Sequence, residues 1–430
     1  MKFGTDGIRG RYPDRLGEDT ARELAAALCA RQPGCMAVVG RDTRPSGEAL
    51  SEAFCDALAA HGGIAVDVGV MPTAGVAYMT SRYGADRGVV VSASHNPAEY
   101  NGLKVFGKGG LKASEDDERA LEAAKPTAPI GGGRVLRAPY AAESYAAFVA
   151  EERDLGGMKV LLDCAHGAAG AVAKAAFETA GARVTAINAD GDGAHINDRC
   201  GALHARLLAG SAARFDAVFA FDGDADRVIA LRPDGVLVDG DHILAMLADF
   251  MHKSGRLMYD TVVGTVMTNT GVERCLGERG ISLVRTAVGD KYVLDEMLRE
   301  GYNLGGEQAG HVIMTDILPT GDGIATALAL CNVMQKSGKG LAELDLARDF
   351  PQCLINVPAD ARALSGAHFR AFERDVRANY PDCRIVIRPS GTEPLVRILA
   401  ECEDATRAAE AADALAAALK GSAQNQSFSR

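Results

Sequence analysis

Short apolar runs rich in branched side chains alternate with stretches of helical periodicity over most of the chain. The runs predict strands at 36–40, 88–91, 158–163, 183–187, 216–221 and 261–267, and those at 36–40, 88–91 and 216–221 are typical of buried strands. The helical stretches predict helices at 169–180 and 271–280, another that begins near Ser46, and one whose capping box is Thr20 with Glu23. Alternation of this kind is typical of α/β domains with parallel strands.

The pattern changes near Phe350. Strands predicted at 384–388 and 395–400 are joined by a turn, and the Ala-rich helix that follows is expected to end near Lys420. A Pro- and Gly-rich stretch at 125–139 marks an earlier boundary. We therefore expect three related α/β domains with mixed or parallel sheets at 1–138, 139–240 and 241–349, a smaller α+β domain at 350–420, and a disordered polar tail at 421–430.

Composition narrows the class of protein. Of the 430 residues, 47% are hydrophobic and 24% are charged, which is the balance of a folded globular chain. A formal net charge of −11 argues against a nucleic-acid partner, because neutralising phosphates needs clustered Lys and Arg. No apolar run approaches the roughly 18 residues of a membrane helix, so no membrane partner is expected. The ten cysteines occur singly, which favours a reducing compartment and a cytoplasmic protein.

An acidic loop follows the buried run 216–221. Its carboxylates, Asp222, Asp224 and Asp226, stand at alternate positions and repel one another unless they share a cation. Ligands that are all oxygen suit Mg²⁺ or Ca²⁺, but an EF-hand is excluded because its twelfth position would be Pro233. A solvated acidic turn is the alternative, yet ligands of α/β proteins gather where buried strands end.

Ser94 lies in Ser-Ala-Ser-His-Asn-Pro (92–97), directly after the run 88–91. A serine there can be a nucleophile or a phosphate carrier, and Gly102 and Lys104 could bring a backbone N–H and an ammonium to the same anion. An ordinary turn is the alternative. The lack of a G-x-S-x-G sequence weakens the case for a serine hydrolase.

Further segments combine glycines with groups that bind anions or sugars, although a hairpin turn or a structural histidine would explain each of them alone. They are 388–394 with Arg388, Ser390, Gly391 and Thr392, 306–311 with Glu307 and His311, and 4–10 with Arg9. A metal site, a serine suited to carry phosphate and these anion contacts together indicate phosphoryl transfer on a small anionic substrate.

The motifs SASHNP, DGDADR, GEQAGH and RPSGTEP occur together, in order and at family spacing, and on them the chain resembles the α-D-phosphohexomutases from Phe3 to about Glu401. Within that family, FGTDGIRG at 3–10 and Val-Gly-Asp at 288–290 resemble the bacterial phosphoglucosamine mutases. The resemblance implies four domains around a central cleft and Mg²⁺ as cofactor. It also implies interconversion of glucosamine 6-phosphate and glucosamine 1-phosphate, through a phosphoserine and a hexose 1,6-bisphosphate, for UDP-N-acetylglucosamine synthesis.

The resemblance implies roles for individual residues. Ser94 is the expected phosphoserine, and one of its phosphate oxygens would bind Mg²⁺ together with Asp222, Asp224 and Asp226. The other expected roles are proton transfer by Lys104 and His311, an active-site arginine at Arg9, binding of sugar hydroxyls by Glu307, and binding of the non-reacting phosphate by Arg388, Ser390, Gly391 and Thr392. The choice of base between Lys104 and His311 stays open, and we consider a homodimer as the assembly.

The chain departs from the family at Ala309, where members usually have Ser, so a hydroxyl that could contact the sugar is missing. A phosphomannomutase/phosphoglucomutase acting on mannose or glucose phosphates is the main alternative. A metal-dependent phosphatase and a non-catalytic sugar-phosphate sensor rank below it. Ser94 is expected at a loop tip rather than in a core, so its replacement should leave the fold intact.

Overall fold

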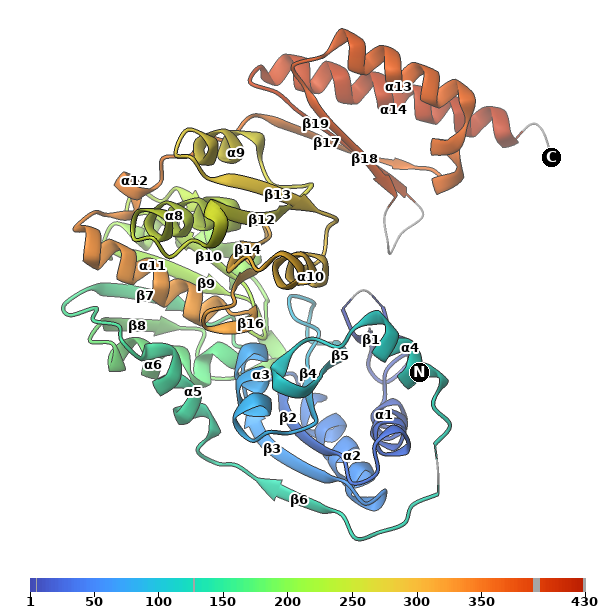
Figure 1. The fold of residues 1–430 in the computed structure, drawn as a ribbon, viewed down its shortest axis with the longest axis vertical. Coiled ribbons are helices and arrows are strands. Elements are labelled where there is room, and N and C mark those ends of the chain that lie inside the picture. Colours follow the sequence, from blue (N-terminus) through green and yellow to red (C-terminus); the bar gives the residue numbers. More distant parts are fainter. Residues whose placement is uncertain (5, 127, 390–394, 428–430) are drawn as a thin grey trace. The chain divides into compact units, whose positions relative to one another are not determined.

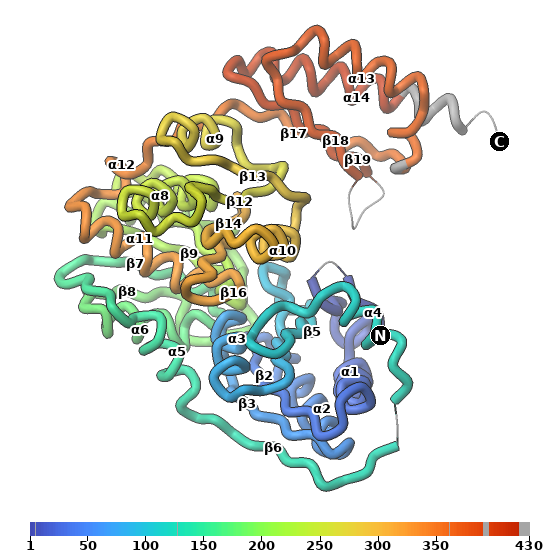
Figure 2. Tube along the Cα trace, viewed as in Figure 1, coloured from blue at the N-terminus to red at the C-terminus, as the bar shows by residue number. Residues whose placement is uncertain are grey.

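The computed structural model describes residues 1–4, 6–126, 128–389 and 395–427, and it divides into two compact units. The first unit comprises Met1–Thr265 and Gly280–Leu346, and the second comprises Val266–Arg279 and Ala347–Arg430. Figure 1 shows three sheets with their helices in the first unit, and Figure 2 traces the chain through them in sequence order. The second unit holds one further sheet.

The first sheet has six strands in the order β1-β5-β4-β2-β3-β6. The strands are β1 (Ile8–Arg11), β2 (Met36–Arg41), β3 (Ile64–Val70), β4 (Arg87–Val91), β5 (Tyr100–Phe106) and β6 (Arg134–Arg137). The helices are α1 (Glu18–Arg31), α2 (Gly47–Ala60), α3 (Thr73–Arg82), the short η1 (Lys108–Gly110) and α4 (Glu115–Ala123). β5 runs antiparallel to both of its neighbours, so the sheet is mixed.

Helices cover both faces of this sheet because alternate strand residues point to opposite sides. Val39 and Val91 pack with Leu24 of α1 and Phe54 of α2 in one buried cluster. On the other face, a Cβ at Gly40 would lie 2.5 Å from the side chain of Val76 in α3, so the helix sits directly on the strand. The layers are therefore helix, sheet and helix.

The second sheet has the order β11-β10-β9-β7-β8. Its strands are β7 (Lys159–Asp163), β8 (Arg183–Ile187), β9 (Ala217–Phe221), β10 (Val228–Leu231) and β11 (Leu237–Val238). Its helices are α5 (Ala141–Ala150), η2 (Ala168–Ala171), α6 (Ala173–Thr179), η3 (Gly193–His195), η4 (Ala202–Leu208) and α7 (Ala209–Ala212). The helix predicted at 169–180 is thus two pieces, because Val172 leaves helical geometry at φ −128°.

The third sheet has the order β13-β12-β14-β15-β16, and it completes the first unit. Its strands are β12 (Thr261–Thr265), β13 (Ser282–Thr286), β14 (Leu304–Gly306), β15 (Val312–Met314) and β16 (Leu318–Gly321). Its helices are α8 (Gly240–Lys253), η5 (Met258–Asp260), α10 (Asp290–Glu300), α11 (Gly323–Ser337) and α12 (Leu341–Leu344). β12 pairs in parallel with β13 and β14, whereas β15 is antiparallel to its neighbours.

The second unit contains an antiparallel sheet in the order β17-β19-β18. Its elements are α9 (Thr270–Gly277), β17 (Gln352–Pro358), η6 (Ala361–Ser365), α13 (Ala367–Asn379), β18 (Arg384–Pro389), β19 (Leu395–Glu401) and α14 (Ala405–Ser427). Ile385 and Ile398 pack against Phe369 of α13 and Leu415 of α14. α14 continues past Lys420, so the predicted end of this helix was too early.

The predicted capping box at Thr20 was wrong. α1 begins at Glu18 with Gly17 as its N-cap, and the carboxylates of Glu18 and Asp19 lie in the first turn, where the helix dipole favours negative charge.

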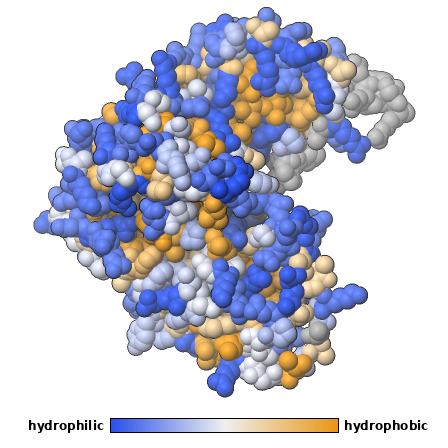
Figure 3. Space-filling model, in the orientation of Figure 1, coloured by the Kyte–Doolittle hydropathy of each residue, from blue (hydrophilic) through white to orange (hydrophobic). Residues whose placement is uncertain are grey.

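The visible surface is mostly hydrophilic, with scattered hydrophobic patches (Figure 3). Within the described residues, no helix combines the length and the apolar character needed to cross a membrane.

Candidate active site

The loop after β4 meets the loop after β9, and this meeting brings Ser94 to the acidic motif. The hydroxyl of Ser94 donates a hydrogen bond of 2.7 Å to Oδ2 of Asp222. Ser94 is 0% exposed, so the expected position at an open loop tip was wrong. The reason is that the acidic loop covers it: a Cβ at Gly223 would lie 2.6 Å from the Ser94 carbonyl oxygen.

The three predicted carboxylates lie together and are buried. Asp222, Asp224 and Asp226 each place a ligand oxygen within 4.8 Å of the others. Among the described residues, Oδ1 of Asp224 and Oδ1 of Asp226 have no hydrogen-bond partner, although both are buried. Burial and the neighbouring carboxylates raise the pKa of Asp222 to about 7. Unpartnered buried oxygens in an all-carboxylate set fit a hard divalent cation.

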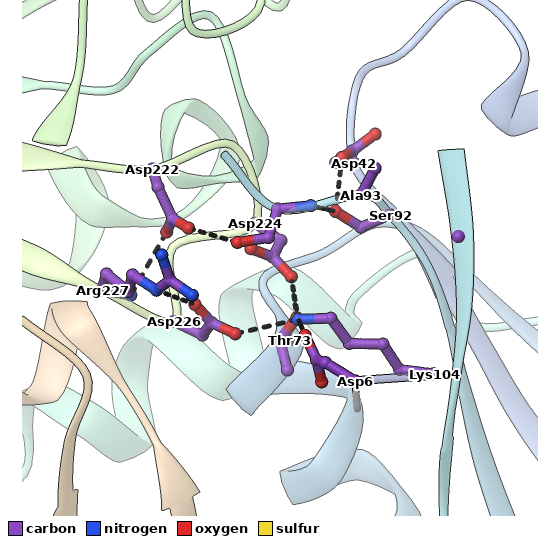
Figure 4. Close-up of polar contacts among 12 residues, drawn as sticks. Asp6, Asp42, Thr73, Ser92, Ala93, Lys104, Asp222, Asp224, Asp226 and Arg227 are labelled. Atoms are coloured by element: carbon purple, nitrogen blue, oxygen red, sulfur yellow. Dashed lines mark hydrogen bonds and ion pairs between the residues drawn. The ribbon is translucent and has the colours of Figure 1, made fainter. Parts of the chain in front are cut away.

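Lys104 neutralises part of this negative charge. Its ammonium on β5 contacts Oδ2 of Asp224 at 2.7 Å and Oδ2 of Asp226 at 2.9 Å, and it lies 3.5 Å from Asp6 (Figure 4). Although burial opposes its charge, the carboxylates hold the pKa of Lys104 well above its ordinary value. In this arrangement Lys104 is therefore a cation.

His311 lies between β14 and β15, next to Asp226 of the acidic loop. Its Nδ1 is 3.7 Å from Asp226 and its Nε2 is 3.6 Å from Asp290. Burial opposes its charge, but the two carboxylates raise the pKa of His311 above its ordinary value. Lys112 links two of these carboxylates, because its ammonium lies 2.6 Å from Asp290 and 2.5 Å from Asp6.

Arg9 on β1 reaches the same region. Its guanidinium pairs with the Asp6 carboxylate and donates to the Ala93 carbonyl at 3.4 Å, next to Ser94. On the acidic loop, Arg227 donates to Nδ1 of His95 at 3.0 Å. Burial and the Arg227 charge lower the pKa of His95 to about 4, so this imidazole is neutral.

Glu307 follows β14 on a loop that turns back into β15. Its Oε1 accepts from the Gly289 N–H at 3.0 Å, which ties the loop to the start of α10. Glu307 is half-buried and Ala309 is exposed. The first unit thus brings together Ser94, the acidic triad, Lys104, His311 and Arg9 around one centre.

The predicted phosphate turn belongs to the second unit. Arg388 on β18 pairs in register with Arg397 on β19, so both cationic side chains leave the same face of the sheet. Burial and the charge of Arg397 lower the pKa of Arg388, as expected where two cationic side chains lie near each other. Ser390, Gly391 and Thr392 lie outside the described residues.

Several residues of this site escaped the sequence reasoning. Arg44 and Asn197 bind the backbone of the Ser94 loop, and Asp42 accepts from Ser92 at 2.6 Å. Lys112 and Asp290 extend the charge network. The only signal for Arg44 was a charged run, Arg-Asp-Thr-Arg at 41–44, directly after a buried strand.

A second group in the other unit has the composition of a metal site. Asp382, Cys383 and Cys402 place ligand atoms within 4.8 Å of one another. However, Arg407 donates to both oxygens of Asp382, at 2.8 and 2.5 Å. Burial and the Cys402 thiol raise the pKa of Cys383 to about 12, so a metal would have to displace both a bound guanidinium and a tightly held proton.

Models of one known protein family match most of this chain. Models described as phosphoglucomutase/phosphomannomutase match it in four parts: the alpha/beta/alpha domains I, II and III at residues 1–128, 138–235 and 239–350, and the C-terminal domain at 354–418. The chain therefore belongs to the phosphoglucomutase/phosphomannomutase family, whose members are phosphohexomutases and hence isomerases. The expected class of three α/β/α domains and a C-terminal antiparallel domain is confirmed.

Relatives extend over nearly the whole chain. A phosphoglucosamine mutase of Mycolicibacterium paratuberculosis is 45% identical, covering 96% of this chain and 99% of that protein. One of Clostridium kluyveri is 40% identical, covering 94% and 95%.

Solved structures share the fold. A phosphoglucomutase/phosphomannomutase family protein of Burkholderia thailandensis has a TM-score of 0.83 at 25% identity, over 98% of this chain and 97% of its own. An N-acetylphosphoglucosamine mutase of Aspergillus fumigatus, solved in complex with GlcNAc-6P and magnesium, has a TM-score of 0.69 at 17% identity, over 98% and 96%. This second likeness is one of fold.

Proposed function

We propose that this protein interconverts glucosamine 6-phosphate and glucosamine 1-phosphate, with Ser94 as the carrier of the transferred phosphoryl group. The relatives of 40% and 45% identity that are named phosphoglucosamine mutase support the substrate. The observation that carries the chemistry is the 2.7 Å contact between the Ser94 hydroxyl and Asp222. A phosphate on this oxygen would lie against a buried acidic triad, an arrangement that is favourable only with a cation between them.

The acidic triad is the proposed Mg²⁺ site. Asp222, Asp224 and Asp226 would hold the ion, with the phosphoserine on Ser94 as a further ligand, because two buried carboxylate oxygens of the triad lack a hydrogen-bond partner among the described residues. Held there, Mg²⁺ would supply positive charge beside the phosphate and the serine oxygen. Lys104, fixed between Asp224 and Asp226, keeps those carboxylates in place and limits their mutual repulsion.

The proposed reaction consists of two phosphoryl transfers, one from Ser94 to the sugar phosphate and one back to Ser94. The bond between phosphorus and the Ser94 oxygen breaks while a bond forms to the free hydroxyl of the sugar phosphate, whose proton passes to a base, and the freed Ser94 oxygen takes up a proton from an acid. The product is glucosamine 1,6-bisphosphate, which must turn around before its other phosphoryl group returns to Ser94. Lys104 and His311 are the proposed groups for proton transfer, and Arg9 is placed to stabilise charge on the transferred phosphoryl group.

The remaining roles concern the substrate. Glu307 is the proposed partner of sugar hydroxyls, and Arg388 with Ser390, Gly391 and Thr392 is the proposed clamp for the phosphate that does not react. The cross-strand pair of Arg388 and Arg397, two cationic residues on one face of the sheet, supports an anion site there. No disulfide joins any of the ten cysteines, all of which lie in the described part of the chain, and this supports a reducing compartment and hence the cytoplasm as the place of action.

Turnover of the competing sugars tests the proposal. Glucosamine, mannose and glucose 6-phosphates should be compared at equal concentration, with inorganic phosphate measured in parallel, because a phosphatase would release it steadily. We expect glucosamine 6-phosphate to have the highest kcat/KM and phosphate release to stay far below turnover. Equal or higher kcat/KM on mannose or glucose phosphates would assign the protein to the alternative activity. The Ala309→Ser variant would show whether the missing hydroxyl sets this preference.

A further inference from the structure

The backbone at Ser94 is held in an uncommon conformation. Its φ is +53°, in the left-handed region that residues with a side chain seldom adopt. Such a conformation persists only where surrounding contacts over-determine it, and it is most often found at functional sites. The contacts on both sides of Ser94 therefore decide where its hydroxyl points.

Arg44 holds the carbonyl side of this loop. Its guanidinium is 0% exposed and donates to four backbone carbonyls: Ser94 at 2.7 Å, Asn96 at 2.8 Å, Tyr100 at 2.9 Å, and Pro97. Its Nε is fixed by Asp42 at 2.9 Å. A lysine could not make these contacts together, because its ammonium has three donors at one point and not a planar fork.

Asn197 reaches the same carbonyls from the second sheet's domain. Its Nδ2 donates to the Ser94 carbonyl at 2.9 Å and to the Asn96 carbonyl at 3.2 Å. The other side of Ser94 is fixed as well, since its N–H donates to Ser92 Oγ at 2.9 Å and that hydroxyl donates to Asp42 at 2.6 Å. Both peptide groups that flank Ser94 are thus held, and the hydroxyl is directed at Asp222.

We propose that Arg44 and Asn197 are positioning residues for phosphoryl transfer: they hold the Ser94 peptide in its left-handed conformation so that the serine oxygen faces the acidic triad. Neither guanidinium nor amide acts on substrate; each acts through the backbone. The inference rests on the proposed function, because it requires Ser94 to be the phosphoryl carrier. Asn197 belongs to the domain that carries the acidic loop, whereas Ser94 belongs to the first domain. Through this hydrogen bond, one domain fixes the geometry of a serine in the other.

The test uses the full-length protein with Arg44→Lys and Asn197→Ala, and each has a matched control. Arg41→Lys replaces a nearby arginine whose carboxylate neighbours, Glu48 and Asp67, lie 3.9 Å away. Asn188→Ala replaces another asparagine with positive φ (+50°), whose amide donates to Asp163 at 2.9 Å and not to the Ser94 loop. Dephosphorylated protein is mixed with glucose 1,6-bisphosphate, and the rate of phosphate transfer onto Ser94 is followed by peptide mass spectrometry.

A displacement of about 1 Å at reacting atoms can cost roughly a hundredfold in rate, so we expect transfer to slow by about tenfold in Asn197→Ala and about a hundredfold in Arg44→Lys. The bisphosphate concentration at half-maximal rate of Asn197→Ala should match that of the wild type, and its unfolding temperature should fall about as far as that of Asn188→Ala, which also places Ala at a positive φ. Both controls should transfer phosphate at the wild-type rate. A loss of stability without a change in rate would assign a merely structural role and overturn the inference.

The outcomes separate the two proposals. If the wild type never takes phosphate on Ser94, the proposed function fails and this inference fails with it. If the wild type and Asn197→Ala load Ser94 at the same rate, the proposed function stands and the positioning role is wrong. Because Asn197→Ala removes a single amide, this variant tests the positioning role even if Arg44→Lys does not fold.

Discussion

The hydroxyl of Ser94 and the carboxylate of Asp222 are 128 positions apart in the chain and 2.7 Å apart in the structure. Ser94 follows a strand of the first sheet, and Asp222 follows a strand of the second. Their contact joins a residue suited to carry phosphate to residues suited to hold a divalent cation. Every proposed step of phosphoryl transfer depends on this pairing.

Replacing Ser94 by Ala removes the proposed phosphoryl carrier. Because the carrier forms a covalent bond to the phosphoryl group, we expect mutase activity to fall by at least about a thousandfold. The variant also loses one hydrogen bond to the buried Asp222 carboxylate, so the free energy of unfolding should fall by about 1–3 kcal/mol while circular dichroism still shows the native fold. Turnover within a few-fold of the wild type would refute the role of Ser94.

Replacing Asp224 by Asn keeps the shape of the side chain and removes one charge from the triad. Its Oδ2 accepts from Lys104 at 2.7 Å and from Thr73 at 2.6 Å, while its buried Oδ1 has no partner among the described residues. We expect Mg²⁺ affinity measured by calorimetry to fall at least about tenfold. Asp234→Asn, in an exposed turn paired with Arg232, is the control and should bind the ion as the wild type does. Equal affinity in both variants would remove Asp224 from the site.

Tyr145 and Asp322 form a buried pair between α5 and the start of α11, with the hydroxyl donating at 2.7 Å. Tyr145→Phe leaves a fully buried carboxylate with one hydrogen bond fewer. We expect the free energy of unfolding to fall by about 1–3 kcal/mol, the cost of an unsatisfied buried group. Tyr78→Phe removes a hydroxyl that accepts a hydrogen bond from the exposed Arg82 at 3.2 Å, and it should change stability far less. A chemical denaturation series would show the difference, and equal losses would contradict the account.

Glu401 gives the second unit a pH dependence. Burial opposes its charge, but hydrogen bonds from Arg384, Gln352 and Thr270 hold the pKa of Glu401 below its ordinary value of 4.5. Because the folded pKa is depressed, the stabilisation is present above pH 4.5 and is lost as pH falls through the folded pKa.

Glu401→Gln should therefore destabilise the protein most near neutral pH, and the difference from the wild type should shrink in acid. Thermal unfolding between pH 7 and pH 3 measures this. Glu403→Gln alters an exposed pair with Arg274 and should show little effect at any pH. A destabilisation by Glu401→Gln that stays constant with pH would contradict the assigned cause.

The sequence predicts the fold class well because buried strands carry continuous apolar runs. The run at 216–221 differs from the fully buried β9 by one position, and 36–40 differs from β2 by one position. Exposed or polar strands leave no such run: all of β6 is exposed, and β5 contains Asn101 and Lys104. The antiparallel course of β5, which carries Lys104 to the acidic loop, was therefore not foreseen.

The chemistry of the site was predictable where it resides in side chains with a recognisable pattern, such as the alternate carboxylates at 222–226. It was not predictable where a side chain acts on backbone atoms. Nothing in the residue type of Arg44 or Asn197 shows that both would meet the carbonyl of Ser94. Ser94 is also buried because the acidic loop of another domain covers it, and the sequence around Ser94 does not show that contact.

Tracking the phosphate on Ser94 follows the covalent step itself. Dephosphorylated protein is loaded with glucose 1,6-bisphosphate, digested for peptide mass spectrometry, and in a parallel sample chased with glucosamine 6-phosphate before digestion. The account predicts phosphate on the peptide that contains Ser94 after loading and its loss to the sugar during the chase, at a rate no slower than turnover. Full mutase turnover while Ser94 stays unmodified would contradict it.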